Sequence, residues 1–109
     1  MSDACIEHRY PQVLTFVHRF GADALVIVDN MASRAQLRDG RLEVETSVRQ
    51  IADRLKVCSK DTVHRRIRQL TRARVISRIT TTSDPFRPPT YVLHLRDTGI
   101  SVTTTSPVR

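Results

Sequence analysis

The chain has 109 residues, a length that suits one domain and leaves little room for a separate effector-sensing domain. Hydrophobic residues make up 39% and aromatic residues 5%, with no Trp, so an aliphatic core is expected. Its net charge of +7 is uneven, because residues 46–96 carry 12 Lys or Arg against 3 Asp or Glu, a net +9, whereas residues 1–45 carry a net −2. A basic segment of this kind is typical of nucleic-acid-binding proteins, and the lack of Trp and Phe on its apolar stripes argues against a membrane-surface helix.

Residues 1–21 are predicted to form an N-terminal arm and an accessory helix. Residues 1–9 are polar and typical of a loose arm. Cys5 and His8 have the spacing of half a zinc site, but no second pair of ligands follows at finger spacing, so no metal site is predicted. A helix is expected over residues 11–20, which begin with Pro and end before Gly21. Its apolar face must pack either on the domain or on a second subunit, which makes this helix a candidate dimer element.

A longer helix is predicted over residues 22–38. Apolar residues recur at helical spacing as far as Ala35, and Gly40 follows as a stop signal. The apolar run over residues 24–28 could alternatively be a strand, but the continued periodicity favours a helix. Leu42 and Val44 then alternate with glutamates, which predicts a short strand.

Two amphipathic helices are predicted in residues 46–74. The first has apolar residues at i, i+3, i+4 and i+7, with Thr46 or Ser47 as its N-cap; these apolar residues are Val48, Ile51, Ala52 and Leu55. The second, over residues 59–74 with Ser59 as N-cap, has one face formed by Val63, Ile67, Leu70 and the stem of Arg74. The opposite face is formed by Asp61, His64, Arg65, Arg68 and Arg72. This cationic face suits a reader of the DNA major groove, and the alternative is a solvated charged face on a core helix.

A β-hairpin is predicted over residues 75–95. Residues 75–82 and 90–95 favour strands, and the segment between them is rich in turn-forming residues. Arg78 lies along the first strand and Arg87 near the tip, where an Arg can enter the narrow DNA minor groove. The alternative for Arg87 is an exposed loop residue without a partner. Residues 97–109 are predicted to be a flexible tail, with transient strand pairing of residues 100–104 as the alternative.

The segments VRQIADRL, SKDTVHRRIRQLTRARVI and PPTYVLHL, in this order, resemble the winged helix-turn-helix family. The resemblance covers about half the chain and implies an α+β, mainly helical domain at residues 22–96, with a two- or three-stranded antiparallel β wing. The family commonly has Leu-Gly-Val-Ser-x-x-Thr-Val between its two helices. Here the segment from Leu55 to Val63 is one residue longer and lacks Gly, which leaves open whether Lys60, Asp61 or Thr62 faces a base.

The resemblance and the charge predict a sequence-specific double-stranded DNA-binding protein, ranked first as a transcriptional regulator. Helix 59–74 would enter the major groove and hairpin 75–95 would act as the wing. The alternatives are a plasmid or phage replication or partition factor and a winged-helix protein-interaction module. Base contacts are assigned to Lys60, His64, Arg65 and Arg68. Phosphate or minor-groove contacts are assigned to Arg49, Ser59, Thr62, Arg72, Arg78 and Arg87.

Enzymatic motifs are not found in the sequence. With three unclustered Gly, no nucleophile elbow and no phosphate-binding loop, the chain is predicted not to be an enzyme and to use no cofactor or small-molecule effector. The family resemblance implies a homodimer. Cys5 and Cys58 are isolated, and neither a secretory signal nor a long apolar run is present, so we expect reduced thiols, no membrane partner and a cytoplasmic, nucleoid-associated protein. Cys58 is interpreted as a small apolar residue that closes the turn, with a redox sensor as the alternative.

Overall fold

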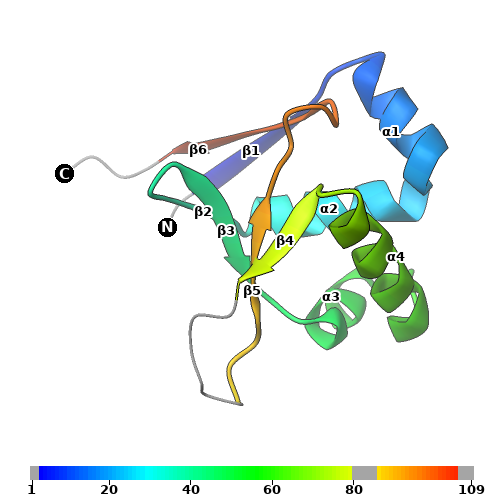
Figure 1. Cartoon of the computed structure of the whole chain (residues 1–109), viewed down its shortest axis with the longest axis vertical. Helices are drawn as coiled ribbons and strands as arrows, with labels where there is room; N and C mark the ends of the chain where they lie inside the picture. The colour runs from blue at the N-terminus through cyan, green and yellow to red at the C-terminus, as the bar shows by residue number, and fades with distance from the viewer. Residues whose placement is uncertain (1–2, 80–85, 106–109) are drawn as a thin grey trace.

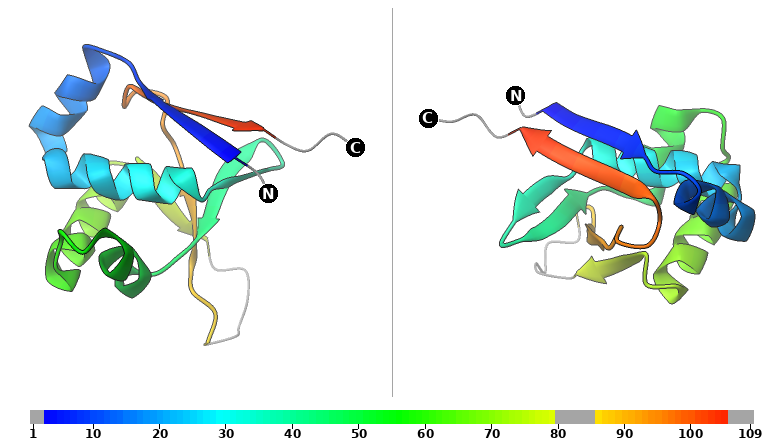
Figure 2. Two further views of the ribbon diagram at one scale, coloured as in Figure 1. Left: turned by 180° about the vertical axis from the view of Figure 1, so that it is seen from behind. Right: turned by 90° about the horizontal axis from the view of Figure 1, so that it is seen from above.

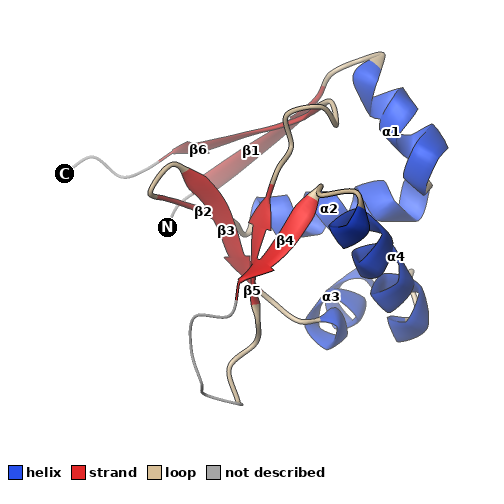
Figure 3. Ribbon diagram, viewed as in Figure 1, coloured by secondary structure: helices blue, strands red, loops and turns tan. Residues whose placement is uncertain are grey.

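The computed structural model describes residues 3–79 and 86–105, which form an α+β domain with four helices and two antiparallel sheets (Figures 1 and 3). The α+β class predicted from the sequence is therefore confirmed. The helices are α1 (Gln12–Phe20), α2 (Ala22–Ser33), α3 (Val48–Leu55) and α4 (Lys60–Arg72). Helix α2 is central, because it contacts each of the other three helices. Five of its residues are buried, namely Ala24, Ile27, Val28, Met31 and Ala32.

The larger sheet has the strand order β2-β3-β5-β4. Its strands are β2 (Gln36–Arg38), β3 (Arg41–Glu45), β5 (Thr90–Leu93) and β4 (Ile76–Ile79). Strand β5 lies between β3 and β4, and Tyr91 is paired with Val44 on one side and with Arg78 on the other. The strand predicted around Leu42 is confirmed, and so is the antiparallel pairing of the two strands of the predicted hairpin. Residues 80–82 of its first predicted strand, and the connection as far as residue 85, lie outside the described residues.

Strand β2 corrects the predicted helix over residues 22–38. The helix ends at Ser33, and residues 36–38 form a hairpin with β3 instead. Asp39 and Gly40 connect the two strands, and both have positive φ angles, 51° and 78°. Asp-Gly is a strong signal for a two-residue hairpin turn, and here this local preference outweighs the helical spacing of the preceding residues. The sheet consequently has four strands, where two or three were predicted.

The two ends of the chain pair with each other. β1 (Asp3–His8) and β6 (Ile100–Thr105) form a separate antiparallel ribbon, which lies against α2 (Figure 2). For residues 3–8 this finding corrects the predicted loose arm. For residues 100–105 it replaces the predicted flexible tail with a paired strand, close to the alternative given for residues 100–104. Residues 1–2 and 106–109 of the two predicted segments lie outside the described residues. Ile6, Ile100 and Val102 pack against the core, and their burial stabilises strands that neither sequence segment specifies alone. His8 Nε2 also lies 3.0 Å from a carboxylate oxygen of Asp29 on α2.

Helix α1 packs on its own domain. Val13, Phe16 and Phe20 are buried in the core, so the apolar face that made this helix a candidate dimer element is occupied within the chain. Of the two alternatives for that face, packing on the domain is the one observed.

The two amphipathic helices predicted in residues 46–74 are confirmed, with one alternative decided and one correction. Ser47 caps α3 by accepting a hydrogen bond from the Gln50 N–H at 3.1 Å, whereas Thr46 is fully buried. Arg74 lies beyond the end of α4 with a φ of 62° and is exposed, so its stem does not extend the apolar face. Lys56 ends α3 in the left-handed conformation, φ 59°, and its N–H donates to Ala52 O at 3.0 Å. Lys56 thus occupies the backbone conformation that Gly adopts most readily at a helix end.

Candidate nucleic-acid interface

Helix α4 is anchored by one face and leaves the opposite face in solvent. Val63 and Leu70 have no exposed surface and Ile67 is 6% exposed. The spacing of these three residues is the one that a 3.6-residue period predicts for a single buried face. The exposed residues of α4 include all four predicted base contacts and one predicted phosphate contact: Lys60, His64, Arg65, Arg68 and Arg72.

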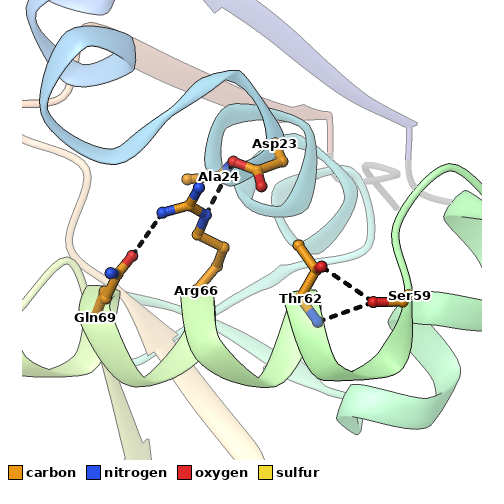
Figure 4. A network of polar contacts seen from close by, with 6 residues as sticks. All are labelled: Asp23, Ala24, Ser59, Thr62, Arg66 and Gln69. Atoms are coloured by element: carbon orange, nitrogen blue, oxygen red, sulfur yellow. Dashed lines mark hydrogen bonds and ion pairs between the residues drawn. The ribbon is translucent and has the colours of Figure 1, made fainter.

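The start of α4 is fixed by a hydroxyl pair. The Ser59 side chain accepts a hydrogen bond from the Thr62 N–H at 3.1 Å, and its own hydroxyl donates to Thr62 Oγ1 at 3.0 Å (Figure 4). Both residues were predicted to contact phosphate. Their hydroxyls are occupied in capping the helix, although the remaining N–H groups of the first turn still point outward from the helix end.

Arg66 holds α4 against α2 and is a residue that the sequence analysis missed. Its Nε lies 2.9 Å from Asp23 Oδ1, and its Nη1 donates to Gln69 Oε1 at 2.9 Å (Figure 4). The Nε–H makes no hydrogen bond, so its contact with Asp23 is ionic. Arg66 stands three residues after Val63 and four before Leu70, at the border of the apolar face. This position could have distinguished it from the outward-pointing Arg65 and Arg68.

A groove of about 400 Å³ separates α4 from the β4–β5 hairpin. Four predicted contact residues meet there, His64, Arg68 and Arg72 from α4 and Arg78 from β4. Among the described residues, none of these four forms an ion pair. The guanidinium charges of Arg68, Arg72 and Arg78 are therefore available to an anionic partner. The remaining lining residues form a mainly apolar floor, and they are Val48, Ile67, Thr71 and Tyr91.

Tyr91 lies in this groove, 5% exposed, directly across the strand pair from Arg78. The sequence analysis did not assign Tyr91 to the site. Burial raises the pKa of its phenol, and the nearby Arg78 guanidinium lowers that pKa by a smaller amount. The phenol therefore stays neutral and can donate a hydrogen bond in the groove at physiological pH.

The raised pKa of Tyr91 predicts a loss of stability in alkali. Because the folded state favours the neutral phenol, Tyr91 contributes to the free energy of unfolding at every pH below the ordinary Tyr pKa of about 10. This contribution is lost as the pH rises through the higher folded-state pKa. Urea unfolding at increasing pH should therefore show a steeper decline for the wild type than for Tyr91→Phe. The chain has two Tyr and no Trp, so phenolate absorbance in Tyr10→Phe reports Tyr91 alone. Equal titration midpoints in the folded and the urea-unfolded variant would contradict the assignment.

Six of the ten predicted contacts do not line this groove, and two of them, Arg49 and Arg87, also lie outside α4 and its N-cap. Arg49 is exposed on α3. Arg87, just after the turn segment of the hairpin, forms an ion pair with Glu45 at 2.9 Å, and its side chain is 57% exposed. An exposed pair of this kind contributes only about 0–1 kcal/mol. The guanidinium can therefore leave Glu45 at little cost, but the structure does not bring it to the His64–Arg78 groove.

A second cationic cluster, not foreseen from the sequence, lies near the start of α3. Arg34 Nη1 donates to the buried Thr46 Oγ1 at 3.4 Å. Partial burial lowers the pKa of Arg34, and repulsion from Arg54 lowers it further. This Arg is therefore held by structural contacts behind the exposed face of α3, and we assign it no part in the interface.

Comparisons of the chain with protein-family models, curated proteins and solved structures find no significant match. The candidate interface therefore rests on the geometry of α4 and the β4–β5 hairpin. In the described part of the chain, no helix has both the length and the apolar character needed to cross a bilayer.

Proposed function

We propose that the chain is a winged helix-turn-helix protein that binds double-stranded DNA in a sequence-specific manner and acts as a transcriptional regulator. In this proposal α4 enters the major groove, and the β4–β5 hairpin is the wing that contacts the flanking backbone. The observation that carries the proposal is the exposed cationic face of α4, which includes His64, Arg65, Arg68 and Arg72. No acidic side chain in the described residues neutralises these four groups in an ion pair.

The dimensions of α4 support this role. Its 13 residues extend about 20 Å at 1.5 Å per residue. A helix with side chains is about 10–12 Å wide, which matches the roughly 12 Å width of the major groove in B-form DNA. Arg65 and Arg68 are three residues apart on the same exposed side, so both can reach base edges from one insertion. Bidentate contact of Arg with guanine is the commonest specific contact in such interfaces.

The position of the hairpin supports phosphate contacts by Arg72 and Arg78. Arg72 ends α4 and Arg78 lies on β4, and both line the groove between helix and hairpin. A DNA backbone that passes over this groove while α4 occupies the major groove would meet these two guanidinium groups. Arg–phosphate contacts of this kind position the protein but carry no sequence information.

The proposal is tested by selecting bound DNA from a randomised duplex pool at about 150 mM salt. We expect enrichment of an inverted repeat with half-sites about 10 base pairs apart, as regulators bind. Enrichment of direct repeats would instead favour a replication or partition factor. For the enriched site, about 6–10 phosphate contacts predict that log K falls with log salt with a slope near −5 to −9. No enrichment together with a shallow slope would contradict DNA binding and favour a protein-interaction module.

A further inference from the structure

One edge of β6 has no strand beside it. Within residues 3–79 and 86–105, β6 pairs with β1 alone, and the β1–β6 ribbon is separate from the four-stranded sheet. A two-stranded ribbon is only marginally stable by itself. Packing of its inner face on α2 supports it, and no other strand in the described part of the chain pairs with the outer edge of β6.

The register shows which backbone groups face outward. The Arg9 N–H donates to Gly99 O at 2.6 Å, and the pairing continues with His8 opposite Ile100. Because hydrogen-bonded and non-hydrogen-bonded pairs alternate along an antiparallel ladder, the N–H groups of residues 101 and 103 face β1. Those of residues 102 and 104 consequently point away from β1, toward the open edge, together with their carbonyl groups.

The sequence of β6 lacks the features that usually protect an exposed edge. Its six residues, Ile-Ser-Val-Thr-Thr-Thr, include no charge and no Pro, and all but one are β-branched. The ladder with β1 also runs without a bulge. Natural edge strands are usually blocked by charged residues, Pro or bulges, because an open edge recruits another strand. The partner strand β1, by contrast, contains Glu7, whose charge would oppose pairing with a second β1.

We propose that β6 pairs antiparallel with β6 of a second copy of this chain, with the two-fold axis at Thr103. In this register Val102 and residue 104 of each copy exchange N–H···O=C bonds with residues 104 and 102 of the other copy. All four outward N–H groups are then satisfied. Residues directly opposite in a pair that does not exchange hydrogen bonds have close Cβ atoms, so the two Thr103 side chains meet on the solvent face. The result is a continuous sheet with the order β1-β6-β6-β1.

This pairing is compatible with a free α4 in each copy. The free ends of the ribbon lie on the side of the molecule away from α4 in every view (Figures 1 and 2). Closed two-fold symmetry uses the same surface on both copies and leaves no further edge of β6 open. The inference does not rest on DNA binding, although two copies of α4 would suit the two half-sites of an inverted repeat.

The first test is the mass of the full chain in solution, measured by light scattering without DNA. We expect a dimer of the 12.4 kDa chain. A monomer at every concentration of a dilution series would overturn the proposal. Because the measurement contains no DNA, failure of the dimer and failure of DNA binding are separate results.

The second test introduces a positive or a negative charge at Thr103, which is exposed. Thr103→Lys and Thr103→Glu should each be monomeric, because like charges would face each other across the axis. An equimolar mixture of the two variants should recover the dimer, because opposite charges then face each other. Circular dichroism should show that each variant alone is folded. A dimer that persists in either single variant, or a mixture that stays monomeric, would overturn the assignment of the axis to Thr103.

Leu14→Lys is the matched control. Leu14 is 57% exposed on α1, the helix that the sequence suggested as a dimer element. The Leu14→Lys variant adds the same positive charge as Thr103→Lys, but on the surface of α1. We expect Leu14→Lys to remain dimeric. A monomeric Leu14→Lys together with a dimeric Thr103→Lys would assign the interface to α1 and overturn the β6 proposal.

Discussion

Replacing Arg65 or Arg68 by Ala is expected to weaken binding to the selected DNA site by about 1–3 kcal/mol each, which is roughly 5- to 150-fold in Kd. Both side chains are exposed on α4 and make no ion pair in the described residues. The double variant should retain only nonspecific affinity. The measurement is a titration of labelled duplex, with the selected site compared with a random sequence at the same salt. An equal loss on both duplexes would show that the two residues contact phosphates instead of bases.

Arg66→Ala provides the control for charge. It removes the same positive charge from the same helix, but the Arg66 side chain contacts Asp23 on α2. We therefore expect nearly unchanged discrimination between the two duplexes and a stability loss of about 1 kcal/mol or less. If Arg66→Ala reduced discrimination as much as Arg65→Ala does, net charge rather than the outward face of α4 would govern binding.

Replacing Leu70 by Ala is expected to lower the free energy of unfolding by about 2–5 kcal/mol. Leu70 is completely buried among the core residues that join α4 to the rest of the domain, and its truncation leaves a cavity. The total stability of a small domain is about 5–15 kcal/mol, so this single change removes a large share. Urea unfolding followed by circular dichroism gives the difference, and a weakened DNA interaction should follow from loss of the fold.

Arg68→Ala is the control for Leu70→Ala on the same helix. It should change the free energy of unfolding by no more than about 0.5 kcal/mol, because Arg68 is exposed. A comparable loss of stability in both variants would contradict the assignment of a buried and an exposed face to α4.

The elements that sequence reasoning located well are those specified by their own residues. Helices α3 and α4 follow from apolar residues at helical spacing, and Ser47 and Ser59 cap them as such residues commonly do. The strand around Val44 follows from alternation. For the candidate site, the outward directions of His64, Arg65 and Arg68 follow from the same period, because they lie opposite Val63 and Ile67.

The features that sequence reasoning missed depend on partners far along the chain. The β1–β6 ribbon pairs residues at opposite ends, so neither strand contains the other half of its signal. Arg66 lies at the border of the apolar face of α4, but its ion-pair partner Asp23 is 43 positions earlier and could not be inferred from the helix alone. Tyr91 enters the groove only because β4 and β5 lie beside α4. Strand β2 is different, because its signal is local: Asp39–Gly40 is a hairpin-turn sequence, whereas the sequence analysis interpreted Gly40 as a helix stop.

The ribbon formed by the two chain ends also bears on how the domain folds. Asp3 pairs with Thr105, so nearly the whole chain must be brought together before this contact forms. Closing so long a loop costs more entropy than forming the neighbouring helices. We therefore expect α2, α3 and α4 to assemble first and the ribbon to join last, once residues 100–105 have been synthesised. Trimming either terminus should release both strands at once and uncover the side of α2 that they shield.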